Sequence, residues 1–486
     1  RVTLICPRSL YRYTYPPLGV MYIGAVLEEA GHSVQIIDPV PEDTSFVQIV
    51  RDFDPQIIGV SIMTASYSLA AGLLRKLKQN IPYALYCAGG AHVTALPVET
   101  MDELNLDFTV IGEGEFTMRE VCEIIENGGD LHGVKGIVYQ NGSAVVNNGP
   151  RDLIQNLDDL PFPGRHLLSD FEKYLVPPGI LRGFYFEHST AIITSRGCPY
   201  HCIYCGSHLI FGRKIRRRSV DNVIGEIEHL VREYNVKALY FLDDIFTLDS
   251  RWVTEFCRQL QERKISISWG CQTRVSMISE ELLYTMKGVG CVLIEFGVES
   301  GSEKVLEILK RKTPIKAIFK AFNLVRKTGL RSSAFFMLGN PGETLKDINQ
   351  TFKVAKKIKA DWTSFGFTIP LPGTELDRMA QENSWYDRDW NFIEAADYEF
   401  KPPMEINFTK EELVAIRNRI RNYFIIRNHL LGHIKYRAIY RMLLILLKKP
   451  SESFKNFMIF AKKRQWARFA DYLGEEYRID LMRKPK

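Results

Sequence analysis

Six short apolar runs alternate with helical patterns between residues 189 and 370, and this repeat restricts the chain to a parallel sheet covered by helices. The first run is STAIITSRG (189–197) and the last is WTSFGFTIP (362–370). Consecutive βα units curl such a sheet into a barrel, whose site lies at the carboxyl ends of the strands. The sequence therefore predicts a partial (β/α)6 barrel over residues 189–384.

The first ~145 residues show the same α/β alternation before the barrel begins. The strand candidates are VTLICP (2–7), SVQIID (33–38), IIGVSIM (57–63), YALYCAGG (83–90) and FTVIGEGE (108–115). This pattern predicts an open, doubly wound, Rossmann-like domain over residues 1–145, in which ligands bind beyond the carboxyl ends of the strands. Residues 146–188 are rich in Pro, Gly and Asp and have no sustained period, so we interpret them as a linker.

Glycine and small polar residues gather at three of these strand ends, where glycine lets a ligand approach the backbone closely. Each glycine could equally serve a tight turn, but three such ends together favour a ligand. The candidate ligand contacts are Thr64, Ser66, Gly89, Gly90, His92, Thr94, Gly112, Glu113, Gly114 and Glu115.

The stretch SRGCPYHCIYC (195–205) places three cysteines within eight positions, directly after the first barrel strand. Three thiolates on one loop can hold three irons of a [4Fe–4S] cluster and leave the fourth iron without a protein ligand. Zinc would need a fourth ligand, for which His201 and His208 are near in sequence. The loop alone leaves both metals open. The other six cysteines lie in apolar runs and are interpreted as core residues.

Composition limits the compartment and the partners. A chain of 486 residues is long enough for two or three domains. Its beginning shows no apolar signal segment, so we expect a reducing cytoplasm. The net charge of +6 is too small to indicate a nucleic acid partner by itself, and none is expected.

The C-x3-C-x2-C spacing after the first strand of a βα barrel resembles the signature of the radical S-adenosylmethionine (SAM) enzymes. With PPLG, GGAH and GEGE in a preceding doubly wound domain, the chain resembles the cobalamin-binding branch of that superfamily over about residues 1–380. The resemblance implies three cofactors: a [4Fe–4S] cluster on Cys198, Cys202 and Cys205, SAM on the open iron, and cobalamin at the strand ends of the first domain. The resemblance further implies that an electron from the cluster would cleave SAM to methionine and a 5′-deoxyadenosyl radical.

The resemblance also implies SAM contacts at the ends of the barrel strands. These contacts are Tyr204, Asp243, Asp244, Arg274, Glu299, Ser300, Gly339, Pro341 and Gly342. Arg274 would pair with the SAM carboxylate, and Glu299 lies at the ribose-binding position. The aspartate pair could equally cap a helix, and the Pro-Gly pair could form an ordinary turn. No other catalytic residue is assigned.

The cobalamin half departs from one pattern of such domains. Many of them place a histidine below cobalt in D-x-H-x-x-G after the first strand, but the corresponding loop here, residues 7–19, contains none. We interpret His92 as a contact to the corrin periphery, and DLHGVKG (130–136) as a coincidence of surface residues. Cobalt without a protein nitrogen below it is therefore expected.

The implied activity is methylation of an unactivated carbon, with one SAM methylating cobalt and a second supplying the radical. The alternative within this architecture is oxidative ring closure or rearrangement without methyl transfer. Sulfur insertion into RNA is disfavoured, because the first domain lacks the three clustered cysteines of methylthiotransferases. A cobalamin carrier would leave the cysteine triplet unexplained. The expected partners are a small or lipid-like substrate and an external electron donor.

Residues 385–486 are expected to be mainly helical, because strand patterns stop and long patterns rich in Arg, Lys and aromatics begin. No apolar stretch reaches the ~18–20 residues of a membrane span. Such basic helices could cover the barrel, lie on an anionic membrane surface, or meet an acidic partner. Peripheral membrane attachment therefore stays open beside a cytoplasmic location.

Overall fold

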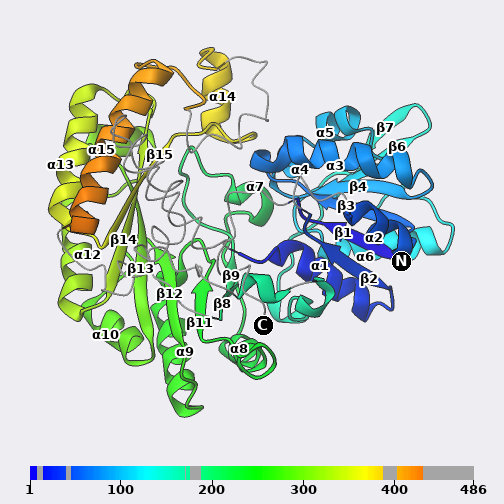
Figure 1. Cartoon of the computed structure of the whole chain (residues 1–486), viewed down its shortest axis with the longest axis horizontal. Helices are drawn as coiled ribbons and strands as arrows, with labels where there is room; N and C mark the ends of the chain where they lie inside the picture. The colour runs from blue at the N-terminus through cyan, green and yellow to red at the C-terminus, as the bar shows by residue number, and fades with distance from the viewer. Residues whose placement is uncertain (8–14, 40–44, 170, 176–187, 387–401, 431–486) are drawn as a thin grey trace, which may run out of the picture.

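The computed structural model describes residues 1–7, 15–39, 45–169, 171–175, 188–386 and 402–430. Two large sheets, of seven and six strands, form two α/β units that pack side by side (Figure 1). The first unit ends with a strand at Asn147 and the second begins with a strand at Ser189. The predicted α/β fold class is confirmed, while the domain limits stay a prediction.

The first sheet has the order β2-β1-β3-β4-β5-β6-β7. Its strands are β1 (Val2–Ile5), β2 (Val34–Ile37), β3 (Ile57–Ser61), β4 (Leu85–Gly89), β5 (Phe108–Val110), β6 (Ile137–Asn141) and β7 (Ala144–Asn147). The first five are parallel and were expected from their apolar runs, whereas β6 and β7 form an antiparallel hairpin at the edge. Sequence reasoning missed this hairpin, although Asn141-Gly142 between the apolar runs IVY (137–139) and AVV (144–146) is a hairpin signal.

Helices cover both faces of the first sheet. They are α1 (Leu18–Glu29), α2 (Phe46–Phe53), α3 (Tyr67–Asn80), α4 (Ala91–Ala95), α5 (Pro97–Leu104) and α6 (Glu115–Glu126). α1 packs with α6, and α2 packs with α3. Alternate residues of β1 accordingly enter different cores, since Leu4 packs in one apolar cluster with α1 and Ile5 packs in another with α2 and α3.

The second sheet has the order β15-β14-β13-β12-β11-β8, all parallel, and curves as a partial barrel (Figure 1). Its strands are β8 (Ser189–Ile192), β11 (Ala238–Phe241), β12 (Ser268–Thr273), β13 (Cys291–Glu299), β14 (Arg331–Leu338) and β15 (Trp362–Phe367). A short antiparallel pair, β9 (Ser195–Arg196) and β10 (Arg216–Arg217), follows β8. This hairpin encloses the cysteine loop.

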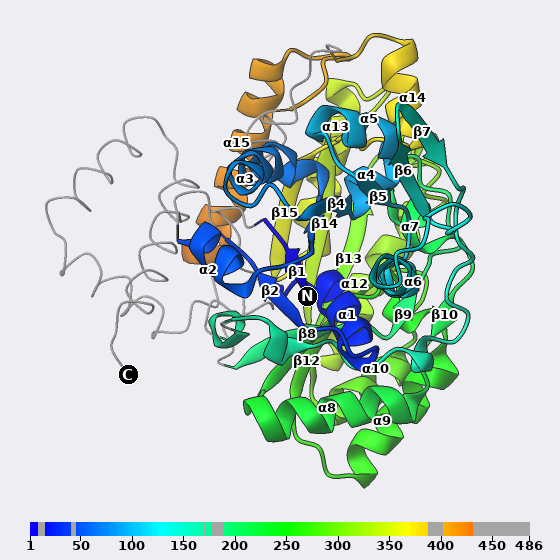
Figure 2. The same ribbon diagram turned by 90° about the vertical axis from the view of Figure 1, so that its right-hand side faces the viewer.

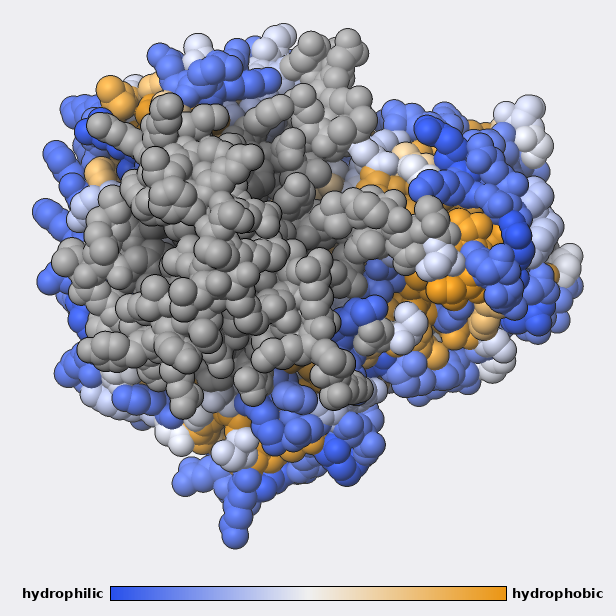
Figure 3. All heavy atoms as spheres, in the orientation of Figure 1, coloured by the Kyte–Doolittle hydropathy of each residue, from blue (hydrophilic) through white to orange (hydrophobic). Residues whose placement is uncertain are grey.

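Helices form the outer layer of the barrel. They are α8 (Val220–Tyr234), α9 (Ser250–Glu262), α10 (Glu280–Gly288), α11 (Glu303–Ile308), α12 (Ile315–Thr328), α13 (Leu345–Ile358) and α14 (Glu375–Glu382). Their inner sides pack on the sheet, as the Phe296–Phe322 ring contact at 5.1 Å between β13 and α12 illustrates. Figure 3 shows mainly hydrophilic side chains where α12 and α13 reach the surface, as expected for amphipathic helices that pack their apolar side on the sheet.

One helix of the basic C-terminal region is described, α15 (Lys410–Leu430), and it packs against β15. The ring of Phe424 on this helix lies 5.9 Å from that of Phe365 on β15. The helical patterns predicted beyond Leu430 lie outside the described residues. Within the described ranges, no helix combines the length and the apolar character needed to cross a bilayer.

The two units meet where their parallel strands end. α4 follows β4 of the first sheet, and α7 (Ser207–Phe211) follows the cysteine loop of the barrel. These two helices pack against each other (Figures 1 and 2). The carboxyl edge of the first sheet therefore faces the loop that carries the cysteines.

Gly90 begins α4 with a φ of +101°, a backbone conformation that residues with a Cβ rarely adopt. An added Cβ would lie 2.8 Å from the carbonyl oxygen of Ile62. Gly90→Ala should therefore cost roughly 1–3 kcal/mol of stability and lower the thermal unfolding midpoint of the protein.

Gly72→Ala is the matched control, because nothing lies within 4 Å of a Cβ added at this position in α3. Alanine is favoured over glycine inside a helix, so the midpoint should stay unchanged or rise. An unchanged midpoint in Gly90→Ala would contradict the backbone described at the start of α4.

Candidate active site

The cysteine loop leaves β9 and re-enters the sheet at β10. Cys198, Cys202 and Cys205 are free, half-buried thiols within this single excursion. Two backbone hydrogen bonds shape the loop: the Cys205 N–H donates to the Cys202 carbonyl at 3.2 Å, and the Cys198 N–H donates to the Gly212 carbonyl at 3.4 Å. Burial raises the pKa of Cys205 to about 11, so cluster assembly must displace protons from the loop.

Two arginines converge on Cys202: Arg274 is buried, and Arg311 is largely buried. The Sγ atom lies 3.7 Å from Arg311 Nη1 and 3.9 Å from Arg274 Nη1. The Nε atoms of both arginines are buried and have no hydrogen-bond partner among the described residues. Buried guanidinium groups need an anion nearby, and a cluster held by three thiolates supplies one. The residues around the loop therefore fit a [4Fe–4S] group.

Arg274 was predicted from the sequence to contact SAM, and the structure places it beside the cluster loop. Its Nη2 group donates to the Arg311 carbonyl and, at 3.4 Å, to Thr313 Oγ1. The guanidinium also covers the ring of Tyr200, 3.7 Å from its centroid. Arg311 was missed, because it lies in the basic run KRKT (310–313), where sequence alone cannot separate a buried arginine from exposed lysines.

Glu299 ends β13 in a left-handed backbone conformation, with a φ of +67°. Its carboxylate lies 3.5 Å from Arg311 Nη2. Burial raises the pKa of Glu299, while Arg311 and a hydrogen bond with Tyr204 act in the opposite direction. The structure therefore brings two predicted SAM contacts, Tyr204 and Glu299, together beside the cluster loop.

The other polar side chains at this barrel edge are engaged in hydrogen bonds within the protein. Asp243 accepts hydrogen bonds from the backbone and hydroxyl of Thr194 and from the hydroxyl of Ser195, which fixes the chain just before the cysteines. Asp244 accepts from Ser207. Ser300 is fully buried, and its Oγ atom accepts from the Ser302 N–H at 3.1 Å. SAM contacts by these side chains stay predictions.

The loop after β14 is organised by a carboxylate that sequence reasoning missed. Glu343 accepts hydrogen bonds from the backbone N–H groups of Gly339 at 2.7 Å and Asn340 at 3.1 Å. Burial raises the pKa of Glu343 to about 7, against the effect of these donors. The predicted SAM contacts Gly339, Pro341 and Gly342 therefore lie on a loop with a fixed shape.

Neutral polar groups occupy the carboxyl edge of the first sheet. Thr64 Oγ1 lies 3.2 Å from His92 Nδ1, and Thr94 Oγ1 accepts from the Gly112 N–H at 3.0 Å. Burial lowers the pKa of His92 to about 4, which leaves this ring uncharged at neutral pH. The predicted cobalamin residues thus lie together at one edge, although their contacts to the cofactor stay predictions. Ser66, Gly89, Gly90 and Gly114 complete this edge.

Glu113 and Glu115 have a further structural role that the sequence did not indicate. Arg196 donates to Glu113 Oε1 at 2.8 Å and to Glu115 Oε1 at 2.6 Å. Arg216 donates to Glu113 Oε2 at 2.6 Å. These arginines belong to β9 and β10, so the glutamates join the first domain to the hairpin that carries the cysteine loop.

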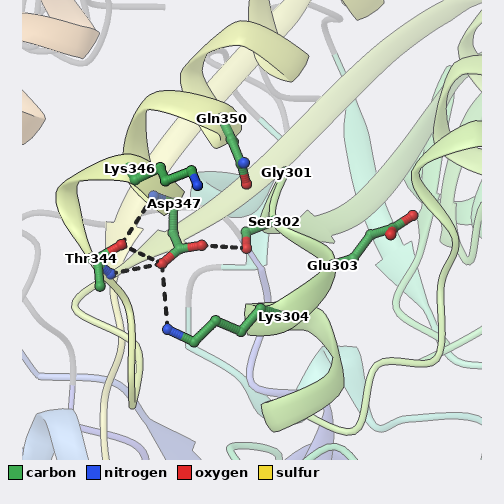
Figure 4. Close-up of a pocket in the computed structure, with 8 residues that line it drawn as sticks. All are labelled: Gly301, Ser302, Glu303, Lys304, Thr344, Lys346, Asp347 and Gln350. Atoms are coloured by element: carbon green, nitrogen blue, oxygen red, sulfur yellow. Dashed lines mark hydrogen bonds and ion pairs between the residues drawn. The ribbon is translucent and has the colours of Figure 1, made fainter.

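A cavity of about 570 Å³ lies between the first turns of α11 and α13 (Figure 4). Its polar groups satisfy one another: Asp347 accepts from Ser302 at 2.6 Å and from Thr344 at 2.6 Å, and it pairs with Lys304 at 3.7 Å. We therefore do not assign this cavity to the chemistry. Among the described residues, no three His, Cys, Asp or Glu side chains converge as ligands of a single metal ion. The three cysteines of the loop would instead each bind a different iron of the cluster.

Comparisons with known proteins agree with this geometry. The B12 binding domain family matches residues 9–122, and the radical SAM superfamily matches residues 192–355. An uncharacterized methyltransferase of Pyrococcus horikoshii is 36% identical over 411 residues, which cover 82% of this chain and 85% of that protein. The chain belongs to the cobalamin-binding radical SAM enzymes. Its cofactors are therefore a [4Fe–4S] cluster, SAM and cobalamin.

Two further relatives of this radical SAM enzyme carry different names. The cytidylyl-2-hydroxyethylphosphonate methyltransferase of Streptomyces wedmorensis is 28% identical, covering 80% of this chain and 83% of that protein. The anaerobic magnesium-protoporphyrin IX monomethyl ester cyclase of Rubrivivax gelatinosus is also 28% identical, covering 74% of this chain and 66% of that protein. The named relatives thus include both a methyltransferase and a ring-closing enzyme.

A solved structure shares the fold. The radical SAM methyltransferase TsrM of Kitasatospora setae, with cobalamin and a [4Fe–4S] cluster bound, superposes with a TM-score of 0.67 at 16% identity. The match covers 79% of this chain and 78% of that one. The order of a Rossmann-like domain followed by a partial barrel is therefore shared with a known member of the family.

Replacing Cys198, Cys202 and Cys205 together with Ala should remove the cluster. Iron in the anaerobically reconstituted protein should fall from about four per chain to background, because three thiolates of one loop hold the cluster. Cys122→Ala, at a buried cysteine of α6, is the control and should keep its iron. Iron retained by the triple variant would place the cluster elsewhere.

Arg311→Met should lower the reduction potential of the cluster by on the order of 50 mV. A guanidinium beside Cys202 stabilises the more negative, reduced cluster, so its loss disfavours reduction. Lys310→Met is the matched control, because this neighbouring lysine is paired with Glu375 at 2.7 Å. Potentiometric titration followed by electron paramagnetic resonance measures both, and equal potentials would exclude an electrostatic role for Arg311.

Proposed function

We propose that this chain is a cobalamin-dependent radical SAM methyltransferase that methylates an unactivated carbon with two molecules of SAM. The observation that carries the proposal is the packing of α4 on α7. It brings the cobalamin edge of the first sheet against the cluster loop of the barrel. When bound, the cluster supplies the electron that cleaves SAM to a radical, and cobalamin carries the methyl group.

The residues of the chain orient these groups and shield them from water. Arg274 and Arg311 place positive charge at Cys202, while Glu299 and Tyr204 lie at the SAM side of the loop. On the opposite side, His92 stays neutral at neutral pH and offers hydrogen bonding without charge. We infer that SAM and cobalamin would face each other across the boundary between the cysteine loop and the carboxyl edge of the first sheet.

The proposed substrate is a small or lipid-like molecule with an unactivated carbon. Phe335 and Met337 are half-buried and alternate along β14 with Phe336, which packs in the outer core. Since neighbouring residues of a strand face opposite sides, Phe335 and Met337 lie on the side of the sheet away from that core. Met337 there packs against the small apolar cluster that includes Ile203 of the cysteine loop, and Phe335 is the half-buried ring beside it. This supports a partly apolar substrate, whose identity the differently named relatives do not define.

The partners and the location belong to the same proposal. Cleaving SAM consumes an electron, so an external electron donor is required. A nucleic acid substrate is not proposed. We place the enzyme in the cytoplasm and interpret α15 as a cover for β15. Peripheral attachment to a membrane would need a lipid-binding surface from residues after Leu430, which lie outside the described part of the chain.

Ring closure without methyl transfer is the second candidate, favoured by the cyclase relative. Counting products separates the two. A methyltransferase should release S-adenosylhomocysteine and 5′-deoxyadenosine in about equal amounts, because each methylation uses one SAM as methyl donor and one as radical source. The product should gain the mass of one methyl group.

A cyclase should release 5′-deoxyadenosine without S-adenosylhomocysteine, and its product should gain no methyl. Liquid chromatography with mass spectrometry, using SAM labelled in its methyl group, measures all three quantities. Turnover without S-adenosylhomocysteine would replace the methyltransferase assignment with ring closure.

A further inference from the structure

A buried cluster of charged side chains joins the first domain to the cysteine loop. Its members are Glu113 and Glu115 from the segment after β5, and Arg196 and Arg216 from the hairpin β9–β10. No side chain in this group is more than 5% exposed. We call these four residues the interdomain charge cluster.

Arg196 is the central member of the interdomain charge cluster. Its two terminal nitrogens bind two different carboxylates, at 2.8 and 2.6 Å. Its guanidinium also lies between aromatic rings of both units, 5.3 Å from the ring of Tyr22 on α1 and 5.6 Å from that of Phe211 on α7. Only a planar fork satisfies these four contacts at once.

The position of Arg196 in the chain connects the interdomain charge cluster to both proposed cofactor sites. It precedes Cys198 by two residues, and its partners Glu113 and Glu115 follow the strand end at the cobalamin edge. Arg216 extends the connection, because its Nη2 group donates at 3.0 Å to the carbonyl of Phe211, the last residue of α7. Both ends of the cysteine loop are thereby tied to one segment of the cobalamin domain.

A buried ion pair adds little net stability, because losing hydration offsets much of the attraction. Its penalty when broken is large, since an unpaired buried charge costs several kcal/mol. The interdomain charge cluster therefore strongly favours this arrangement of the two domains over any shifted arrangement, in which a buried charge would lose its partner. Such a preference matters where two cofactors on different domains must act on one substrate.

We propose that Arg196 is a positioning residue that sets the spacing between the cobalamin edge and the [4Fe–4S] loop. In this role the side chain acts through its contacts with Glu113, Glu115, Tyr22 and Phe211 rather than through the substrate. It holds the first residues of the cysteine loop at a fixed place on the cobalamin domain. The effect on methyl transfer rests on the proposed function, whereas the effect on spacing does not.

Arg196→Lys tests the proposal, because lysine keeps the charge but cannot bind both carboxylates as a fork. Arg165→Lys is the matched control. Arg165 is equally buried and pairs with Glu226 of α8 at 2.6 Å, but it lies in the linker and does not touch the cysteine loop. Glu226 keeps Arg218 as a second partner in this control.

The first measurement is the distance between cob(II)alamin and the reduced cluster in the reconstituted holoenzyme, by pulsed electron paramagnetic resonance. The wild type and Arg165→Lys should give the same narrow distance distribution. Arg196→Lys should give a distribution that is shifted or at least twice as broad. A wild-type distribution in Arg196→Lys, or an equal change in Arg165→Lys, would overturn the proposal.

A second measurement does not require cofactors, so it can also be applied to a variant that fails to bind them. Spin labels introduced through non-cysteine chemistry at the exposed residues Tyr83 and Tyr284 report the distance between the two units in the full chain without cofactors. The same criteria apply: broadening in Arg196→Lys alone supports the proposal, and its absence overturns it.

The functional readout is the ratio of 5′-deoxyadenosine to methylated product. This ratio should rise several-fold in Arg196→Lys and stay unchanged in Arg165→Lys, because a displaced cobalamin edge lets radicals form without methyl capture. An unchanged ratio together with altered spacing would overturn the role in methyl transfer. If no variant forms methylated product, the proposed function fails while the spacing result stands.

Discussion

Four buried charges decide how the two halves of this molecule fit together. Arg196 and Arg216 on the barrel side face Glu113 and Glu115 on the cobalamin side, and all four are shielded from water. Since an unpaired buried charge is far more costly than a missing apolar contact, sliding one sheet along the other would be penalised steeply. The linker between the domains adds a buried ion pair of its own, Arg165 with Glu226 of α8. The placement of the cofactor sites relative to each other therefore depends on electrostatics at the domain boundary.

The two faces that this boundary brings together differ in charge. The barrel side carries two largely buried guanidinium groups at Cys202, which suit a cluster of thiolate-bound iron. Apart from Glu113 and Glu115, whose charges are paired with Arg196 and Arg216, the cobalamin side carries hydroxyls, glycine backbone and a histidine that burial keeps neutral. Positive charge is thus confined to the side where negative charge accumulates on reduction. An arrangement of this kind stabilises the reduced cluster without attracting anions to the methyl-carrying side.

The strands of both sheets and the place of the cysteine loop could be predicted because apolar periodicity and the Cys spacing are local properties. The edge hairpin β6–β7 was missed although its signal is also local, since apolar runs flank Asn141-Gly142. The interdomain charge cluster could not be predicted from the sequence, because Arg196 and Glu113 are 83 residues apart and meet only after both domains have packed. Arg311 reaches Cys202 over 109 residues in the same way. Residues that join elements need the tertiary structure to be found, even when they lie beside a recognised motif.

Glu299 shows how far the barrel edge departs from regular geometry at its site. The pairing of β13 with β14 shifts register between Gly297 and Glu299, and Glu299 itself adopts a positive φ. Such a conformation costs a residue with a Cβ on the order of 1–3 kcal/mol. Arg311 and Tyr204 hold the carboxylate in place, so the strain is offset by the same guanidinium that faces Cys202. Arg311 consequently connects the irregular backbone at Glu299 and its carboxylate to the cysteine loop. A change in charge at the cluster should be felt at Glu299 through Arg311, which links the redox state of the iron site to the SAM-binding edge of the barrel.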